Sequence, residues 1–310
     1  MQKILDKFGI TEKNFLGAGV ECRVFYKDER EVIKIYNKFK DPSYVNKLSD
    51  FYNSLNPDYV NVQTPEILSA YDEDPEHTVL IEKRLAGICP TDEYLNSLEL
   101  NKLIIFINNY VEFLFKIEVI ETTFFDKENS AYKNKSFKFS TWNNSLFQNI
   151  VYFSSNISDN LKQTILYFDS KEEYLMKEIK NTKIEKISFV HGDASNKNIL
   201  VDENFNISAL YDFGSWTTSG DYIFDVAVGW LLFNKNKTIE KINATDYMLS
   251  LILKKLTRKE RKRFYKYLLY YAFITLNMFA KGNIEDPHYS WCKEILNNQN
   301  NWREIGFTVS

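Results

Sequence analysis

Two carboxylates and one amide lie close together in the sequence and have the side-chain types needed for phosphoryl transfer. Asp193 and Asn198 share one polar loop, with four residues between them, and Asp212 follows a later apolar run. The β-prone runs around them predict strand, loop, strand, turn, strand and loop. Phosphoryl transfer needs one carboxylate to orient the acceptor hydroxyl, while an amide oxygen and a second carboxylate hold Mg²⁺. Two polar turns in a strand meander would explain Asp193 alone, but they explain the whole set poorly.

These residues have the spacing of the protein-kinase loops H-R-D-x-x-x-x-N and D-F-G. Here the motif reads HGD at 191–193, then Asn198, then DFG at 212–214. HGD in place of HRD, together with GDYIFDVA at 220–227, resembles the aminoglycoside phosphotransferases, the small-molecule branch of the kinase-like fold. Within that branch the stretch is most similar to hygromycin B phosphotransferases, and residues 264–290 resemble their C-terminal helical part.

The resemblance implies an α+β, bilobal, protein-kinase-like fold. A small N-terminal antiparallel sheet lobe, residues 1–86, would bind the nucleotide, and a larger, mainly helical lobe, residues 87–310, would carry catalysis and bind the substrate. The implied activity is transfer of the γ-phosphate of ATP (or GTP) to a hydroxyl of an aminoglycoside antibiotic, which gives resistance. Asp193 would be the catalytic residue, and Asn198 and Asp212 would bind Mg²⁺.

A glycine turn precedes these motifs near the N-terminus. Residues 15–26 predict a strand, a turn and a second strand, with Gly17 and Gly19 in the turn. Glycines there can lay backbone N–H groups over nucleotide phosphates without a Cβ in the way. Cys22 stands where the third glycine of G-x-G-x-x-G would be, so a plain hairpin turn explains the pattern about as well.

Lys34 lies inside the next apolar run, and we interpret it as the lysine that contacts the α- and β-phosphates. The alternative is an edge-strand lysine that faces water. A kinase fold pairs this lysine with an acid from the following helix, which we expect over residues 43–55. No glutamate occurs between Glu31 and Glu66, and Asp50 is the only acid inside that helix. The sequence therefore leaves the partner of Lys34 open.

The next two predicted strands cover residues 65–71 and 77–83, and RLAG ending at Gly87 resembles the family's hinge. A hinge binds adenine through backbone groups, so side-chain identity says little about it. The resemblance adds these hinge residues to the cofactor-binding set: Glu82, Lys83 and Arg84. The boundary between the lobes is placed near Gly87.

After residue 91 the pattern becomes helical. Asp92 is expected to cap a helix that runs to about Ile117, two helices are expected within 145–180, and Gly282 is a plausible helix stop. Residues 120–144 could be a substrate-side loop or an insertion. Further helices are expected at 225–233, 245–256, 259–280 and 287–296.

The composition limits the partners and the compartment. The 310 residues include 44% hydrophobic and 16% aromatic side chains, which is ample for a core. A net charge of −3 argues against a nucleic-acid binder and permits a cationic substrate. Three scattered cysteines and the lack of a signal peptide or apolar span favour a cytoplasmic protein away from membranes. We also expect a monomer or weak dimer, although no feature of the sequence fixes the oligomeric state. Six of the ten glycines fall in the segments that the kinase-like interpretation needs.

Several roles stay open at this point. His191 could be a general base, although bracing of the loop is favoured. Acids such as Glu285 or Asp286 could line an acceptor pocket for a cationic aminoglycoside. Two other functions fit the fold: a metabolic small-molecule kinase of the choline, homoserine or fructosamine type, and a catalytically idle kinase-like binding protein. The presence of Asp193 and Lys34 with the metal-binding pair weighs against the idle protein.

Overall fold

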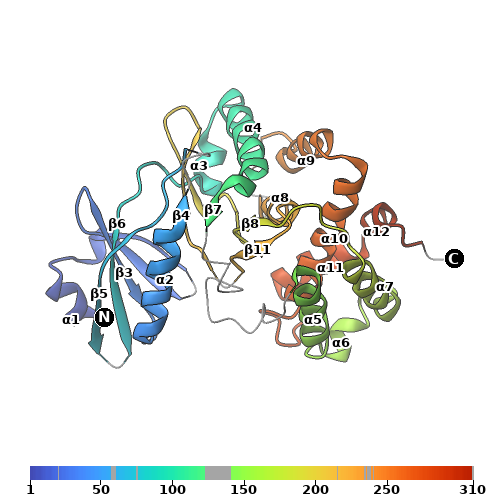
Figure 1. Ribbon diagram of the computed structural model, residues 1–310, viewed down its shortest axis with the longest axis horizontal. Helices are drawn as coiled ribbons and strands as arrows, with labels where there is room; N and C mark the ends of the chain where they lie inside the picture. Colours follow the sequence, from blue (N-terminus) through green and yellow to red (C-terminus); the bar gives the residue numbers. More distant parts are fainter. Residues whose placement is uncertain are drawn as a thin grey trace.

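A computed structural model shows two lobes, a small one built on a sheet and a larger, mainly helical one (Figure 1). This confirms the α+β, bilobal, kinase-like fold. None of the helices in the described part of the chain is long and apolar enough to cross a membrane. The structure describes residues 1–19, 21–56, 61–74, 76–122, 141–214, 216–233, 235, 239 and 241–308.

The small lobe contains a five-stranded antiparallel sheet in the order β1-β2-β3-β6-β5. Helix α1 lies against one face and α2 against the other (Figure 1). Asp41 caps α2 by accepting a hydrogen bond from the backbone of Ser43, and a proline opens the helix. The strands are β1 (Phe15–Ala18), β2 (Cys22–Tyr26), β3 (Glu31–Tyr36), β5 (Ile67–Asp74) and β6 (His77–Lys83). The helices are α1 (Gln2–Lys7), the 3₁₀ turn η1 (Glu12–Asn14) and α2 (Pro42–Ser54).

Strand alternation gives the sheet two different faces. Ile33 and Ile35 of β3 are buried with Val79 and Ile81 of β6 in a core that α1 completes. The alternate residues of the two strands therefore face α2, because successive side chains point to opposite sides of a sheet. Lys34 is one of them, so this lysine of a central strand faces the interior.

The large lobe is organised around α10, which packs against α5, α7, α8, α11 and α12. The apolar side of α10 is buried. The helices are α3 (Asp92–Ser97), α4 (Leu100–Lys116), α5 (Trp142–Ser154), α6 (Asp159–Lys162), α7 (Phe168–Lys180), α8 (Ile223–Leu232), α9 (Ala244–Lys255), α10 (Arg258–Thr275), α11 (Pro287–Asn297) and α12 (Gln299–Ile305), with the 3₁₀ turn η3 (Ile117–Val119).

Three helix predictions were wrong in detail, and one helix was missed. The two helices expected within 145–180 are three, because the short helix α6 lies between α5 and α7. The helix expected from Asp92 to Ile117 is two helices, and Thr91 caps the first by accepting from Tyr94 N. The chain breaks after Ser97, whose hydroxyl donates to Tyr94 O, and the next two residues are extended. The helix expected to end near Gly282 stops at Thr275. The last helix, α12, was missed, and most of residues 120–144 lie outside the described residues.

Short strands hold the predicted catalytic stretch. Strand β8 pairs with β11, and β9 pairs with β10, all antiparallel. The loop with Asp193 joins β8 to β9, and Asp212 follows β10, so the predicted order of strands and loops is confirmed. The strands are β8 (Ser188–Val190), β9 (Ile199–Val201), β10 (Ile207–Leu210) and β11 (Thr218–Gly220); β4 (Leu55–Asn56) pairs with β7 (Glu121–Thr122).

The lobes meet where Gly87 passes over β9 and β10. Its φ is +131°, and a Cβ there would lie 2.5 Å from Ser208 Oγ and 2.8 Å from Val201 O. Ile88 bonds to Val201 in both directions at 2.9 Å. Only glycine fits this conformation and close approach. The predicted domain boundary at Gly87 stays a prediction, because residues before it, such as Gln63, also bond to β10.

Candidate active site

Asp225 fixes the start of the catalytic loop. This buried α8 carboxylate accepts the backbone N–H of His191 at Oδ2 and that of Gly192 at Oδ1, both at 2.7 Å. Gly192 has a φ of +85°, and a Cβ there would lie 2.4 Å from Trp216 Cβ. The loop therefore enters the site through a position that glycine alone tolerates, and one carboxylate satisfies two buried donors.

His191 braces this loop. Its Nε2 lies 3.0 Å from Tyr211 O, and its Nδ1 accepts the backbone N–H of Asp193 at 3.2 Å. Its ring lies against Phe213, with centroids 4.8 Å apart. Burial lowers the pKa of His191 to about 4, although the bond to Tyr211 O opposes this shift. With Nδ1 occupied by the Asp193 amide, a neutral His191 has no nitrogen left to take a substrate proton.

Asp193 and Asn198 lie together in the loop. Asn198 Nδ2 donates to Asp193 O at 2.8 Å and to its Oδ2 at 2.9 Å. Burial raises the pKa of Asp193 to about 7, the negative charge of Asp212 adds to the rise, and the Asn198 hydrogen bond opposes it. A carboxylate whose proton affinity lies near neutrality suits a group that accepts a hydroxyl proton.

Asp212 begins the second loop in a strained conformation. Its φ is +61°, in the left-handed region that most residues other than glycine avoid. Phe213 anchors it: the ring is buried against His191 and against Phe51 and Tyr52 of α2, with centroids 5.4 and 5.9 Å away for the two α2 rings. The α2 helix therefore packs directly on the residue next to Asp212.

The Asn198 amide and the Asp212 carboxylate fit a magnesium ion chemically. Both Asn198 contacts to Asp193 use the amide nitrogen, which leaves Oδ1 to face a cation. Oxygen ligands of this kind suit Mg²⁺. Within the described ranges no three His, Cys, Asp or Glu side chains form a metal cluster. Nucleotide phosphates and water would therefore have to complete the ligand set.

Lys34 lies on the face of the sheet that packs against α2, and Glu82 is its acidic neighbour. Lys34 Nζ is 3.9 Å from Glu82 Oε1, and both side chains are buried. Burial opposes the charged lysine, but Glu82 and weaker contributions from nearby groups outweigh it, so the pKa of Lys34 is raised well above its ordinary value. Asp50, the acid considered from the sequence, is exposed on α2.

The glycine turn is open. A Cβ added at Gly17 or Gly19 would meet no atom within 4 Å, and neither residue has a positive φ. Nothing in the described protein therefore requires glycine at these positions. The Gly19 N–H is held by Cys22 O at 2.9 Å, which closes the turn.

Two backbone N–H groups of the predicted hinge already donate hydrogen bonds to carbonyl groups of the small lobe. Lys83 N–H bonds to Glu66 O at 2.9 Å, and Arg84 N–H bonds to Arg30 O at 2.7 Å. These N–H groups are therefore not available to a nucleotide base, and their exposed side chains form ion pairs at the surface. The next N–H group, that of Leu85, makes no backbone hydrogen bond in the described chain, so it is the open donor of this segment.

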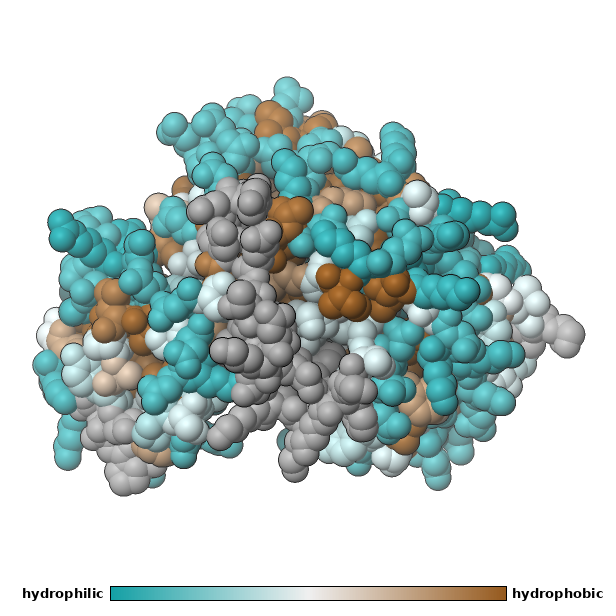
Figure 2. All heavy atoms as spheres, in the orientation of Figure 1, coloured by the Kyte–Doolittle hydropathy of each residue, from teal (hydrophilic) through white to brown (hydrophobic). Residues whose placement is uncertain are grey.

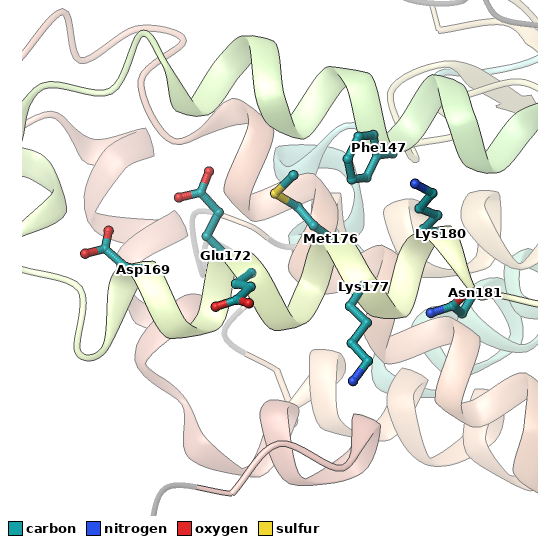
Figure 3. A pocket seen from close by; sticks show the side chains of 8 residues that line it. Phe147, Asp169, Glu172, Met176, Lys177, Lys180 and Asn181 are labelled. Atoms are coloured by element: carbon teal, nitrogen blue, oxygen red, sulfur yellow. The ribbon is translucent and has the colours of Figure 1, made fainter.

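A separate hollow of about 390 Å³ lies on the outside of the large lobe, between α5 and α7 (Figure 3). The Asp169 and Glu172 carboxylates lie at one end of it and Lys180 at the other. It shares no residue with the site described above, and we assign it no part in phosphoryl transfer. Figure 2 shows mostly hydrophilic side chains over both lobes, with apolar ones gathered in a few places.

Comparisons with known proteins identify the family. The family model described as "Phosphotransferase enzyme family" matches residues 15–242, which include the predicted catalytic, metal-binding and nucleotide-binding residues but not Glu285 or Asp286. No curated protein matches the chain. A solved structure of a thermostable mutant of aminoglycoside phosphotransferase APH(4)-Ia, in a ternary complex with ADP and hygromycin B, superposes with a TM-score of 0.72 at 16% identity, covering 99% of both chains.

Two further structures show the same fold. Aminoglycoside phosphotransferase APH(4)-Ia gives a TM-score of 0.68 at 16% identity, covering 99% of this chain and 98% of that one. The GDP and kanamycin complex of APH(2")-IIIa gives 0.61 at 13% identity, with the same coverage. With the family model spanning more than half of its length, the chain belongs to the phosphotransferase enzyme family.

Proposed function

We propose that the protein transfers the γ-phosphate of ATP or GTP to a hydroxyl of an aminoglycoside, with Mg²⁺, and so confers resistance to that antibiotic. The observation that carries the proposal is the Asp193 carboxylate, whose pKa is raised to about 7 and which Asn198 orients beside Asp212. The relatives with the same fold were solved with nucleotides and with hygromycin B or kanamycin bound, which supports the substrate class.

The chemistry follows from the positions of these groups. Asp193 accepts the hydrogen bond of the acceptor hydroxyl and takes its proton as the new O–P bond forms. The bond from the γ-phosphorus to the bridging oxygen breaks, and the nucleoside diphosphate leaves. Lys34 contacts the phosphates from the small lobe. Mg²⁺ held by Asn198 and Asp212 would neutralise the phosphate charge.

A cationic acceptor needs carboxylates around the cleft. Asp193 is one of them. Glu285 is exposed and free to serve, whereas Asp286 caps α11 by accepting Tyr289 N–H at 2.8 Å. Of the two acids proposed from the sequence, Asp286 is the one whose charge acts on Lys235, a residue that also interacts with Asp193.

One observation favours a second candidate, a metabolic kinase whose alcohol carries less positive charge than an aminoglycoside. Lys235 contacts His288 Nδ1, lies 4.4 Å from the centre of the Trp291 ring, and interacts electrostatically with Asp193. Burial lowers the pKa of Lys235. A lysine this near the catalytic carboxylate would repel a polycation and attract an anionic substituent.

The test is a phosphotransfer assay on the purified protein. Hygromycin B, kanamycin and the alternative alcohols choline and homoserine are offered with ATP or GTP, with and without Mg²⁺, and the product is detected by ³¹P NMR. We expect phosphorylation of an aminoglycoside, weakened by added salt, and raised resistance in a susceptible bacterium that expresses the gene. Asp212→Ala should abolish metal-dependent nucleotide binding. Phosphorylation of a metabolic alcohol, with no aminoglycoside phosphorylated, would establish the second candidate.

We also propose that the small lobe, residues 1–86, binds the nucleotide and that the large lobe, residues 87–310, binds the acceptor. All three cysteines are free thiols, which supports a cytoplasmic location. We propose a monomer or weak dimer there.

A further inference from the structure

Lys34, Glu82 and Tyr52 form a buried polar cluster between the sheet and α2. The exposed fractions of these residues are 9%, 7% and 4%. Glu82 Oε1 and Tyr52 Oη have no hydrogen-bond partner in the described chain. A buried polar atom without a partner destabilises the folded state, because it has given up its hydrogen bonds to water. A cluster with two such atoms next to the phosphate-binding lysine points to a functional role, because stability alone would disfavour it.

Strand register explains how Glu82 reaches Lys34. Lys34 lies opposite Leu80, and Val32 lies opposite Glu82 in the antiparallel pair of β3 and β6. Lys34 and Glu82 are therefore diagonal neighbours on one face, within reach of long side chains. Their separation of 3.9 Å is an ion pair without a direct hydrogen bond, so the ammonium donors stay available to a ligand.

Helix α2 contributes a phenol at this place and no carboxylate. Tyr52 is buried against Phe213, with ring centroids 5.9 Å apart, and it contributes to the electrostatic environment of Lys34. The single acid of α2, Asp50, is exposed. The ion pair thus lies within the sheet, where a shift of α2 would not separate its members.

We propose that Glu82 positions Lys34 for the nucleotide phosphates in place of a carboxylate on α2, with Tyr52 closing the cluster from the helix. The inference rests on the proposed function. It makes the lysine independent of the position of α2, since both members of the pair belong to adjacent strands of one sheet.

The test compares Glu82→Gln with the matched control Asp50→Asn, which removes the only acid of α2. We expect Glu82→Gln to lower kcat about 10- to 100-fold while the KM for the magnesium nucleotide changes less than twofold. A misfolded variant would instead lose nucleotide binding and unfold at a lower temperature. Glu82→Asp should recover part of the lost kcat, and Asp50→Asn should behave like wild type.

A double-variant cycle tests whether Glu82 acts through Lys34. In a Lys34→Met background, Glu82→Gln should change turnover less than twofold. The proposal is overturned if Glu82→Gln turns over within twofold of wild type, if its full effect persists without Lys34, or if Asp50→Asn costs as much. A wild-type protein that binds no magnesium nucleotide would reject the proposed function itself. An active wild type with a silent Glu82→Gln would reject only this inference.

Discussion

At the scale of single residues, the pKa of the Asp193 carboxyl is subject to two opposing influences. Burial and Asp212 favour its protonated form, whereas Asn198 favours the ionised one. Asp193→Asn keeps the shape but removes the basic oxygen, and general-base assistance is typically worth about 10²–10⁴-fold in rate. We expect turnover to fall by about that factor with nucleotide affinity nearly unchanged, because Lys34 and Asp212 remain. Steady-state kinetics with a parallel nucleotide titration measure both quantities; lost nucleotide binding would place Asp193 in the metal site instead.

Asp225 allows a prediction about stability. Asp225→Ala leaves the buried N–H groups of His191 and Gly192 without an acceptor, at about 1–3 kcal/mol each. We expect the free energy of unfolding to fall by about 2–5 kcal/mol in urea titrations. Asp225→Asn keeps one acceptor oxygen and should lose less. Equal losses for the two variants would show that packing of the side chain, and not its hydrogen bonds, holds the loop.

The sequence was informative where the chemistry is local. Asp193 and Asn198 share one loop, so their spacing alone predicts that they meet. The partner of Lys34 could not be found this way, because Glu82 lies on another strand and the pairing depends on register. The sequence did carry one indication. Glu82 lies two residues after Leu80 in the run that ends at Lys83, so the two side chains point to the same side of the strand.

At the scale of elements, the apolar periodicity of the sequence predicted where helices lie more accurately than where they begin and end. The apolar spacing that predicted one helix after Asp92 is also compatible with two, because the break at Ser97 depends on a side-chain hydrogen bond. At the end of α10, Thr275 Oγ1 donates to Tyr271 O within the helix, and Thr275 O lies 3.1 Å from Nε2 of His288 on α11. The contact with His288 joins two different helices, so it leaves no pattern in the sequence of α10.

Lys171 of α7 gives a prediction for pH dependence. Its ammonium is buried and donates to Leu296 O of α11 at 2.7 Å. Burial lowers the pKa of Lys171 from 10.5 to about 8. Below pH 8 the folded protein carries the cost of a buried charge. Between that pH and 10.5 the unfolded chain binds more protons, so stability contributed by this group rises with pH.

Replacing Lys171 should therefore help at neutral pH. In Lys171→Met the Leu296 carbonyl keeps a donor, because Trp302 Nε1 also bonds to it at 2.7 Å. We expect the variant to be about 1–3 kcal/mol more stable than wild type at pH 7. The advantage should shrink by about 2 kcal/mol at pH 9.5, where wild-type Lys171 is neutral. Urea titrations at both pH values give the difference; an advantage that stays constant with pH would contradict the assigned shift.

At the scale of the whole molecule, the resemblance predicted the two lobes but not the contacts that join them. Gln63 forms a parallel bridge with Ala209, and Ile88 pairs with Val201, so segments from both sides of the sheet lobe dock on β9 and β10. No periodicity in either segment predicts these contacts, because each involves only one or two residues. The boundary at Gly87 was expected from the resemblance and stays a prediction, whereas glycine is needed at this position because a Cβ would lie 2.5 Å from Ser208 Oγ.

Alanine substitutions can separate the glycines required by the fold from those required by a ligand. Gly87→Ala forces a Cβ to within 2.5 Å of Ser208 Oγ at a φ of +131°, so the free energy of unfolding should fall by about 2–4 kcal/mol. Gly17→Ala and Gly19→Ala meet nothing within 4 Å and should leave stability within about 0.5 kcal/mol of wild type.

Gly17→Ala and Gly19→Ala should nevertheless bind the magnesium nucleotide at least about tenfold more weakly than wild type. The reason is that a Cβ would block the approach of backbone N–H groups to phosphate. Thermal or urea unfolding without nucleotide gives the first quantity, and calorimetric titration gives the second. If these two variants bind nucleotide like wild type, the turn between β1 and β2 is a plain hairpin. If they lose stability, the turn has a structural role of its own. Unchanged stability with weakened binding would identify this turn as the part of the small lobe that covers the phosphates.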